Sequence, residues 1–179
     1  MLTKREQRQK IRALKSTSNE DEQAEESKRI MECVLSHPKV KASEVILMYY
    51  SLPDEVDTHA AIDTLCQEGK IVLLPKIIDN EHLELRRYTG MSDMTSGQFG
   101  IMEPVGTPFA SIKNVDVAIV PGMSFDSQCH RLGRGKGYYD RLLSQMPRTY
   151  IIGVCFEFQK CENLPCDKHD IQMDEIISQ

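Results

Sequence analysis

One stretch of the chain combines glycines, cations and hydroxyl-bearing aromatics in a pattern that suits phosphate. It follows an apolar run at residues 115–120 and reads Arg131, Leu132, Gly133, Arg134, Gly135, Lys136, Gly137, Tyr138, Tyr139 and Asp140. Glycine lets backbone N–H groups approach an anion closely, and Arg and Lys supply the opposite charge. An aspartate just beyond such a loop can hold magnesium. The stretch, called the glycine-cation loop below, therefore predicts phosphate or nucleotide binding.

The spacing of its glycines matches neither of the two common nucleotide motifs. A phosphate loop of nucleotide hydrolases needs Gly, four residues and then Gly-Lys-Ser/Thr, and the dinucleotide fingerprint is also absent. Two simpler explanations stay open, namely an exposed flexible turn and a basic surface patch that binds nucleic acid. A helix predicted to begin near Gly137 favours phosphate, because its N-terminal dipole would point at the same anion.

A second group of cations lies on a helix predicted over residues 2–15. Lys4, Arg8 and Arg12 are spaced i, i+4, so they share one face of that helix. Such a row is often only a solvated face. The alternative is a second basic element that folds over the phosphates from the opposite side.

Acidic residues at two further positions could bind a substrate or a metal ion. Glu55 follows a predicted buried strand, where a carboxylate can bind the amide-like N–H groups of a heterocyclic substrate. Asp140 can pair with Lys136 on a helix surface, or it can hold magnesium together with a second acid. Asp170 and Asp174 are the C-terminal candidates for that second acid.

The elements that must position these residues alternate between strand and helix. The expected strand at residues 44–50 contains the continuous apolar run 45–50, which is typical of a strand buried on both faces of a parallel sheet. The other expected strands are 70–74, closed by Pro75, and 82–88, 116–120 and 150–156. The expected helices are 2–15 with Leu2, Ile11 and Leu14 as apolar contacts, 17–35 capped by Thr17 or Ser18, 57–68, and 137–146. Residues 89–114 are expected to be mostly loop.

This alternation predicts an α/β fold, a three-layer sandwich with a largely parallel central sheet of Rossmann-like type. Ligands bind at the carboxyl ends of the strands in such sheets, which would bring the loops after Tyr50, Leu74 and Val120 to one edge. The 179 residues are expected to form a single domain spanning 1–179.

Composition narrows the class of protein. The net charge of −5 argues against nucleic acid as a partner, and no apolar run approaches the roughly 20 residues needed to span a membrane. The basic, polar start of the chain predicts a cytoplasmic protein whose six cysteines are reduced. Cys161, Cys166 and His169 fit no standard zinc spacing, so no zinc site is expected from them.

The motifs taken together resemble the 5-formyltetrahydrofolate cyclo-ligase family, also called methenyltetrahydrofolate synthetases. The glycine-cation loop after residues 120–126 carries the resemblance most specifically. Further motifs follow in family order over essentially the whole chain: Lys4 and Arg8, residues 50–58, residues 69–75, residues 99–104, and His169-Asp170.

The resemblance implies an ATP- and Mg²⁺-dependent ring closure of 5-formyltetrahydrofolate to 5,10-methenyltetrahydrofolate, with release of ADP and phosphate. It implies catalytic roles for Arg134 and Lys136 and magnesium ligation by Asp140 and Asp170. The implied ATP-binding residues are Lys4, Arg8, Arg131, Leu132, Gly133, Arg134, Gly135, Lys136, Gly137, Tyr138 and Tyr139. The implied folate-binding residues are Tyr50, Glu55, Arg134, Gly135, Lys136, Gly137 and Tyr138.

The expected partners are the two small-molecule substrates, with no nucleic acid and no membrane, and the expected state is a monomer. Two other hypotheses remain. One is another small-molecule kinase or sugar-phosphate enzyme on a similar sheet, which would turn over without folate. The other is a phosphate- or RNA-binding module, whose affinity would fall steeply with salt.

Overall fold

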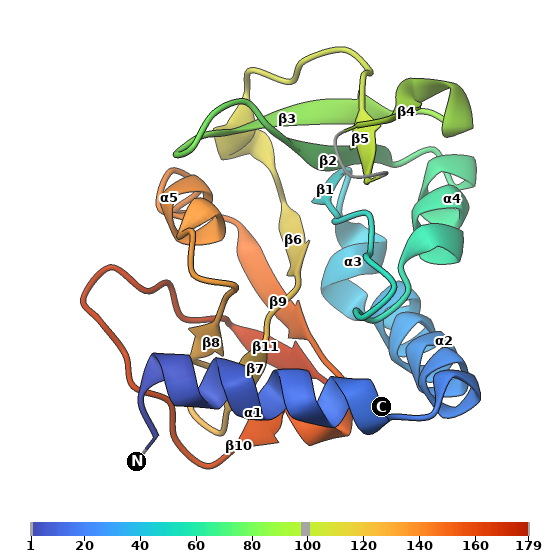
Figure 1. Cartoon of the computed structure of the whole chain (residues 1–179). Coiled ribbons are helices and arrows are strands. Elements are labelled where there is room, and N and C mark those ends of the chain that lie inside the picture. Colours follow the sequence, from blue (N-terminus) through green and yellow to red (C-terminus); the bar gives the residue numbers. More distant parts are fainter. Residues whose placement is uncertain (1, 98–100, 179) are drawn as a thin grey trace.

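A six-stranded sheet forms the centre of the molecule (Figure 1). The computed structural model describes residues 2–97 and 101–178. The strand order is β11-β9-β6-β1-β2-β3, and all neighbours are parallel except β2 and β3. The strands are β1 (Val45–Leu47), β2 (Ile71–Ile77), β3 (Leu83–Tyr88), β6 (Val117–Val120), β9 (Tyr150–Val154) and β11 (Glu175–Ile177). The predicted largely parallel sheet is therefore confirmed.

Both faces of the central strands are buried, which explains why their sequences are continuous apolar runs. In β1, Ile46 packs into one hydrophobic core, while Val45 and Leu47 pack into another on the opposite face. The same alternation occurs in β6, where Ile119 faces the first core and Ala118 the second.

Helices cover both faces and complete the predicted three layers (Figure 1). On one face lie α2 (Glu20–Ser36), α3 (Pro38–Ala42) and α4 (His59–Gln67), which contribute to the first core. On the other face lies α5 (Tyr138–Leu143), whose Leu142 and Leu143 join the second core together with Met146.

A small second sheet lies beside the main one and was not predicted from the sequence. It consists of β7 (Ser124–Asp126), β8 (Arg131–Leu132) and β10 (Lys160–Cys161), in the order β10-β7-β8. Helix α1 (Lys4–Thr17) packs on it through Ile11, which contacts a core with Met123, Leu132 and Leu164. This packing brings the N-terminal helix next to the glycine-cation loop.

The segment predicted to be mostly loop contains a short hairpin. Its strands are β4 (Met94–Ser96) and β5 (Met102–Pro104), which pair antiparallel. Three-residue 3₁₀ helices, η1 (Met91–Asp93) and η3 (Ile112–Asn114), flank it, and a similar turn, η4 (Glu157–Gln159), follows β9. Phe99 and Gly100 of the family motif lie outside the described residues.

Several predicted details were wrong. Leu2 and Leu14 are 45% and 36% exposed, because α1 buries only Gln7 and Ile11. The N-cap of α2 is Asn19, whose side chain accepts a hydrogen bond from the backbone N–H of Asp21.

Pro75 does not close β2 but lies inside it. Its missing N–H is tolerated because β1 pairs only with Ile71–Leu73, so that edge of β2 has no strand neighbour at Pro75. The helix predicted over 137–146 is also shorter, since α5 ends at Leu143.

Candidate active site

The glycine-cation loop connects β8 to α5, and two of its glycines have a left-handed backbone. Gly135 has φ +110° and Gly137 has φ +67°, conformations that side-chain-bearing residues rarely adopt. Gly137 is the N-cap of α5, which has only six residues. The helix dipole proposed from the sequence is correspondingly small, so the charge of the loop comes from its cations.

Helix α1 lies along this loop. Nε of Arg8 donates a hydrogen bond to the carbonyl oxygen of Gly133 at 2.8 Å, and its guanidinium lies 3.5 Å from where a Cβ on Gly135 would be. Nζ of Lys4 donates to Asp167 Oδ2 at 2.7 Å and also to Asp170. Arg8 therefore contacts the loop, which favours the alternative of a second basic element, whereas Lys4 pairs with two C-terminal acids and Arg12 is exposed.

Arg131 is the buried cation of the loop. Its Nη2 donates to Asp140 Oδ1 at 3.0 Å, its Nη1 to the Pro121 carbonyl at 3.3 Å, and its guanidinium lies 5.4 Å from the centre of the Tyr139 ring. Nε of Arg131 is buried and has no hydrogen-bond partner among the described residues. A buried N–H without an acceptor is costly, so an anionic oxygen at this place would be favourable.

Arg134 connects the loop to the turn that follows β1. Its Nη2 lies 2.8 Å from Asp54 Oδ1 and 2.9 Å from Glu55 Oε1. The Glu55 side chain is only 11% exposed, and its other oxygen accepts a hydrogen bond from the backbone N–H of Leu52 at 3.0 Å. Burial alone would raise the pKa of Asp54, but Lys15 and Arg134 lower it below its usual value. The predicted folate acid and the predicted catalytic cation are thus in direct contact.

The remaining predicted residues divide into two groups. Lys136 is exposed and forms no ion pair within the described part of the chain. The Tyr138 hydroxyl donates a hydrogen bond to the Asp79 carbonyl oxygen at 3.0 Å. Tyr50 is placed differently, since its ring stacks on His59 with centroids 3.9 Å apart and its hydroxyl points to the Met91 sulfur. The partners of Tyr50 are therefore not loop residues.

The two predicted magnesium ligands approach one another through the backbone. Asp140 Oδ1 accepts a hydrogen bond at 3.2 Å from the N–H of Ile171, the residue after Asp170. Burial would raise the pKa of Asp170, but Lys4, the Asp167 N–H and Arg131 lower it, which keeps the carboxylate ionised. Carboxylate oxygens are the protein ligands that Mg²⁺ prefers, so the two side chains are of the type that could hold the ion. Asp174 instead accepts the Ile151 N–H.

Comparisons with known proteins identify the family of this chain. The family model described as the 5-formyltetrahydrofolate cyclo-ligase family matches residues 1–179. The chain belongs to this family. It is 30% identical to the mouse 5-formyltetrahydrofolate cyclo-ligase, over 96% of this chain and 89% of the mouse protein. It is 31% identical to the Haemophilus influenzae cyclo-ligase, over 97% of each chain.

A solved cyclo-ligase-family structure has the same fold. The NMR structure of Aquifex aeolicus 5,10-methenyltetrahydrofolate synthetase is similar with a TM-score of 0.86 and 35% sequence identity, over 98% of this chain and 89% of that one. The predicted fold class, family and type of enzyme, a ligase, are therefore confirmed.

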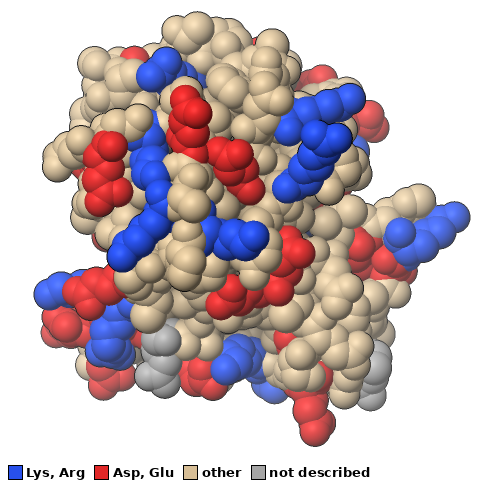
Figure 2. Space-filling view, turned by 180° about the vertical axis from the view of Figure 1, so that it is seen from behind, with Lys and Arg blue, Asp and Glu red and all other residues tan. Residues whose placement is uncertain are grey.

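The surface charge of the protein bears on the hypothesis of RNA binding, and the length and polarity of its helices bear on membrane insertion. On the face seen in Figure 2, Lys and Arg side chains alternate with Asp and Glu rather than forming a continuous basic patch. An RNA-binding surface would need such a patch, so this face of the cyclo-ligase fold does not favour one. Among the described residues, no helix is long and apolar enough to cross a membrane.

Sequence reasoning missed the ion pairs that join Lys15 and Asp54 to Arg134 in this candidate site. The Lys15 side chain is only 7% exposed, and its Nζ lies 2.9 Å from Asp54 Oδ2. A signal existed, because Lys15 follows Arg8 by seven residues and Lys4 by eleven, which places all three on one side of a helix. The prediction instead followed the i, i+4 spacing from Lys4 and Arg8, which selects Arg12.

Proposed function

We propose that this cyclo-ligase family member closes the ring of 5-formyltetrahydrofolate to 5,10-methenyltetrahydrofolate, using ATP and releasing ADP and phosphate. The observation that carries the proposal is the contact of Arg134 with Glu55. It joins the loop suited to phosphate with the acid suited to a heterocycle. The two substrates would then meet at this guanidinium.

The chemistry needs activation of a poor leaving group. The formyl oxygen on N5 attacks the terminal phosphorus of ATP, the bond from that phosphorus to ADP breaks, and the formyl carbon becomes electrophilic. N10 of the folate then attacks that carbon and loses its proton, and the formyl oxygen leaves as part of phosphate. Positioning and neutralisation of charge dominate such phosphoryl transfers, so a protein nucleophile is not required.

The cations around the loop would neutralise the phosphates. Lys4 and Arg8 would bind ATP from α1, and residues 131–139 would surround its phosphates, with the buried Nε of Arg131 as one donor that lacks an acceptor among the described residues. Arg134 and the exposed Lys136 would stabilise the charge on the phosphoryl group in transit. Their exposure allows both side chains to reorient toward the ligand.

Folate would bind at the turn after β1. Glu55 is nearly buried, with one oxygen held by the Leu52 N–H and the other by Arg134, so its carboxylate has a fixed direction for the N–H groups of a pterin. Tyr50, stacked on His59, would contact the folate from the end of the same strand. Residues 134–138 would contact both substrates.

Magnesium would be held by Asp140 and Asp170, and it would neutralise charge on the phosphates when bound. The two carboxylates already pair with Arg131 and Lys4, so these cations and the ion would share the negative charge of the site. All proposed ligands come from one chain, so the proposed site needs no second copy and a monomer would suffice; the proposed location is the cytoplasm.

An absorbance assay tests the proposal. Methenyltetrahydrofolate absorbs in the near ultraviolet, so purified protein with 5-formyltetrahydrofolate and Mg-ATP should develop that absorbance. The same mixture without ATP is the control, and ADP release is measured in parallel. ADP release that does not depend on folate would support another kinase, and a folded protein that produces no absorbance would contradict the proposal.

A further inference from the structure

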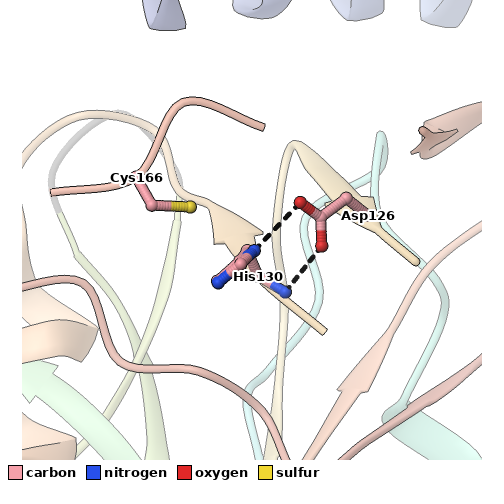
Figure 3. Close-up of side chains that lie close together, drawn as sticks. All are labelled: Asp126, His130 and Cys166. Carbon is pink, nitrogen blue, oxygen red and sulfur yellow. Dashed lines mark hydrogen bonds and ion pairs between the residues drawn. The ribbon is translucent and has the colours of Figure 1, made fainter. Parts of the chain in front are cut away.

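A cluster of three possible metal ligands lies beside the small sheet and uses none of the acids proposed for magnesium. Asp126 ends β7, His130 precedes β8, and Cys166 comes from the segment after β10 (Figure 3). One ligand atom from each side chain lies within 4.8 Å of the other two. This is the only group of three such ligands among residues 2–97 and 101–178.

Asp126 and His130 are already fixed in position. The Asp126 side chain is 1% exposed and accepts hydrogen bonds from the backbone N–H groups of Gln128, His130 and Leu164, each at 2.9 Å. Such bonds favour an ionised carboxylate. Nδ1 of His130 lies 3.0 Å from Asp126 Oδ2, and since a carboxylate only accepts, Nδ1 carries the shared proton.

We propose that Asp126, His130 and Cys166 bind a thiophilic divalent cation of the Zn²⁺ type. The cation would take the place of the proton between Nδ1 and Oδ2. Two metal bonds of about 2.0–2.2 Å at a tetrahedral angle need an N···O separation of about 3.4 Å, so the His130 ring would have to move by a few tenths of an ångström from its present 3.0 Å. Cys166 is exposed, so its sulfur can move to the roughly 2.3 Å that a Zn–S bond requires.

The protons and charges balance in this arrangement. The proton on Nδ1 moves by tautomer exchange to Nε2, and the Cys166 thiol loses its proton to solvent. A carboxylate and a thiolate then neutralise the two charges of the ion, and a water molecule completes four-coordination. The donors also set the type of metal, because thiolate and imidazole favour Zn²⁺ over Mg²⁺.

The same three residue types could also suggest a nucleophilic cysteine, but the surroundings of the thiol argue against that. Partial burial of the sulfur is the largest cause that raises the pKa of Cys166, and the negative charges of Asp126 and Asp170 raise it further. Lys4 only partly opposes this shift. A reactive cysteine needs the opposite shift. The zinc grouping weighed from the sequence was also different, since it contained Cys161 and His169 in place of Asp126 and His130.

The site would have a structural consequence. Asp167 follows Cys166 directly, and Asp167 and Asp170 both pair with Lys4 of α1. A cation that joins Cys166 to the turn between β7 and β8 would hold this segment, and with it both carboxylates, against the N-terminal helix.

Cobalt is a suitable probe because it replaces zinc and its thiolate complexes absorb visibly. We expect titration of the reduced full chain with Co²⁺ to give one equivalent with the d–d bands of a tetrahedral ion and a sulfur-to-cobalt charge-transfer band. Cys166→Ser should abolish the charge-transfer band. Cys33→Ser, which removes an exposed thiol on α2, should leave it unchanged. Zn²⁺ should displace the cobalt.

A second variant keeps the test independent of the cysteine. His130→Gln should weaken binding of Co²⁺ and Zn²⁺ by about tenfold or more. Zn²⁺ should raise the melting temperature of the native sequence but not of His130→Gln. The proposal is overturned if the native chain shows no charge-transfer band, or if Cys166→Ser and His130→Gln bind the metal as the native chain does.

Discussion

Lys15 and Asp54 form an ion pair that connects the N-terminal helix to the proposed folate-binding turn. Nζ of Lys15 lies 2.9 Å from Asp54 Oδ2, while the other oxygen of Asp54 accepts a hydrogen bond from Arg134 at 2.8 Å. The Lys15 side chain is 7% exposed, so solvent does not compete strongly for it. Lys15 thereby positions Arg134 through Asp54, without touching the loop itself.

Lys15→Met should therefore reduce activity by misplacing Arg134. We expect kcat to fall about tenfold with a smaller change in the KM for folate, since Glu55 keeps its bond to Leu52. Unfolding free energy should fall by about 1–2 kcal/mol because Asp54 remains partly solvated. Lys10→Met, at an exposed position of the same helix, is the control for both measurements. Equal kinetics in the two variants would contradict the positioning role.

Arg134→Ala and Lys136→Ala should lower turnover far more than stability. Removing a group that stabilises transition-state charge costs about 10²–10³ in kcat, whereas an exposed loop contributes little to the core. Arg134→Lys should rescue activity only weakly, because an ammonium lacks the planar fork that contacts Asp54 and Glu55 together. Arg12→Ala, an exposed cation of α1, is the matched control. Near-normal turnover in the two loop variants would refute their roles.

Asp170→Asn should raise the Mg²⁺ concentration needed for half-maximal rate by about tenfold, if Asp170 is a ligand. Asp167→Asn separates this role from ion pairing with Lys4, because Asp167 also pairs with Lys4 but is 73% exposed. We expect its magnesium dependence to stay near that of the native chain. The measurement is the rate of absorbance change as Mg²⁺ is varied at fixed ATP.

Acid should destabilise the protein through carboxylates whose pKa is lowered on folding. Burial would raise the pKa of Asp126, but the Leu164 and His130 N–H groups and the His130 ring lower it below its ordinary value of 3.8. A folded pKa below the unfolded one stabilises the protein above the unfolded pKa, and this stability is lost as pH falls through the folded pKa. The free energy of unfolding measured in urea should therefore decrease below about pH 4.

Asp126→Asn tests this assignment. The variant should be less stable near neutral pH and lose less stability on acidification, because the amide does not titrate. Glu32→Gln, which changes an exposed carboxylate on α2, should keep the steep acid dependence of the native chain. If the free energy of unfolding fell with pH equally steeply in Asp126→Asn and in the native chain, another group would be responsible for the acid dependence.

Cys129 should be a site of local backbone strain. Its φ is +64°, and it is the only residue other than glycine with positive φ in the described part of the chain. Cys129→Gly should raise the unfolding free energy by about 0.5–1 kcal/mol. Cys129→Ala removes the thiol but keeps the Cβ, so it should not give this gain. Thermal unfolding of the two variants distinguishes strain from loss of packing.

The main sheet was predictable from the sequence because its central strands are buried on both faces. The continuous apolar runs around Ile46 and Ile119 reflect that burial directly. The small sheet was not predictable, since strands of two or three residues such as β8 and β10 leave no periodic pattern.

The residues of the candidate site were predictable as types, but their pairing was not. The contacts of Lys4 with Asp170 and of Arg134 with Glu55 join residues far apart in the sequence. Such contacts depend on how α1 packs on the small sheet, and a linear pattern does not record this.

The pairing of Lys4, Arg131 and Arg134 with carboxylates has a consequence for selectivity among anions. An incoming anion gains only the difference between its own attraction to a cation and the ion pair that it replaces. Chloride and inorganic phosphate are small and can contact few of these cations at once, so they gain little from that exchange. A triphosphate contacts several cations at once, so the internal ion pairs would keep abundant simple anions from competing with it.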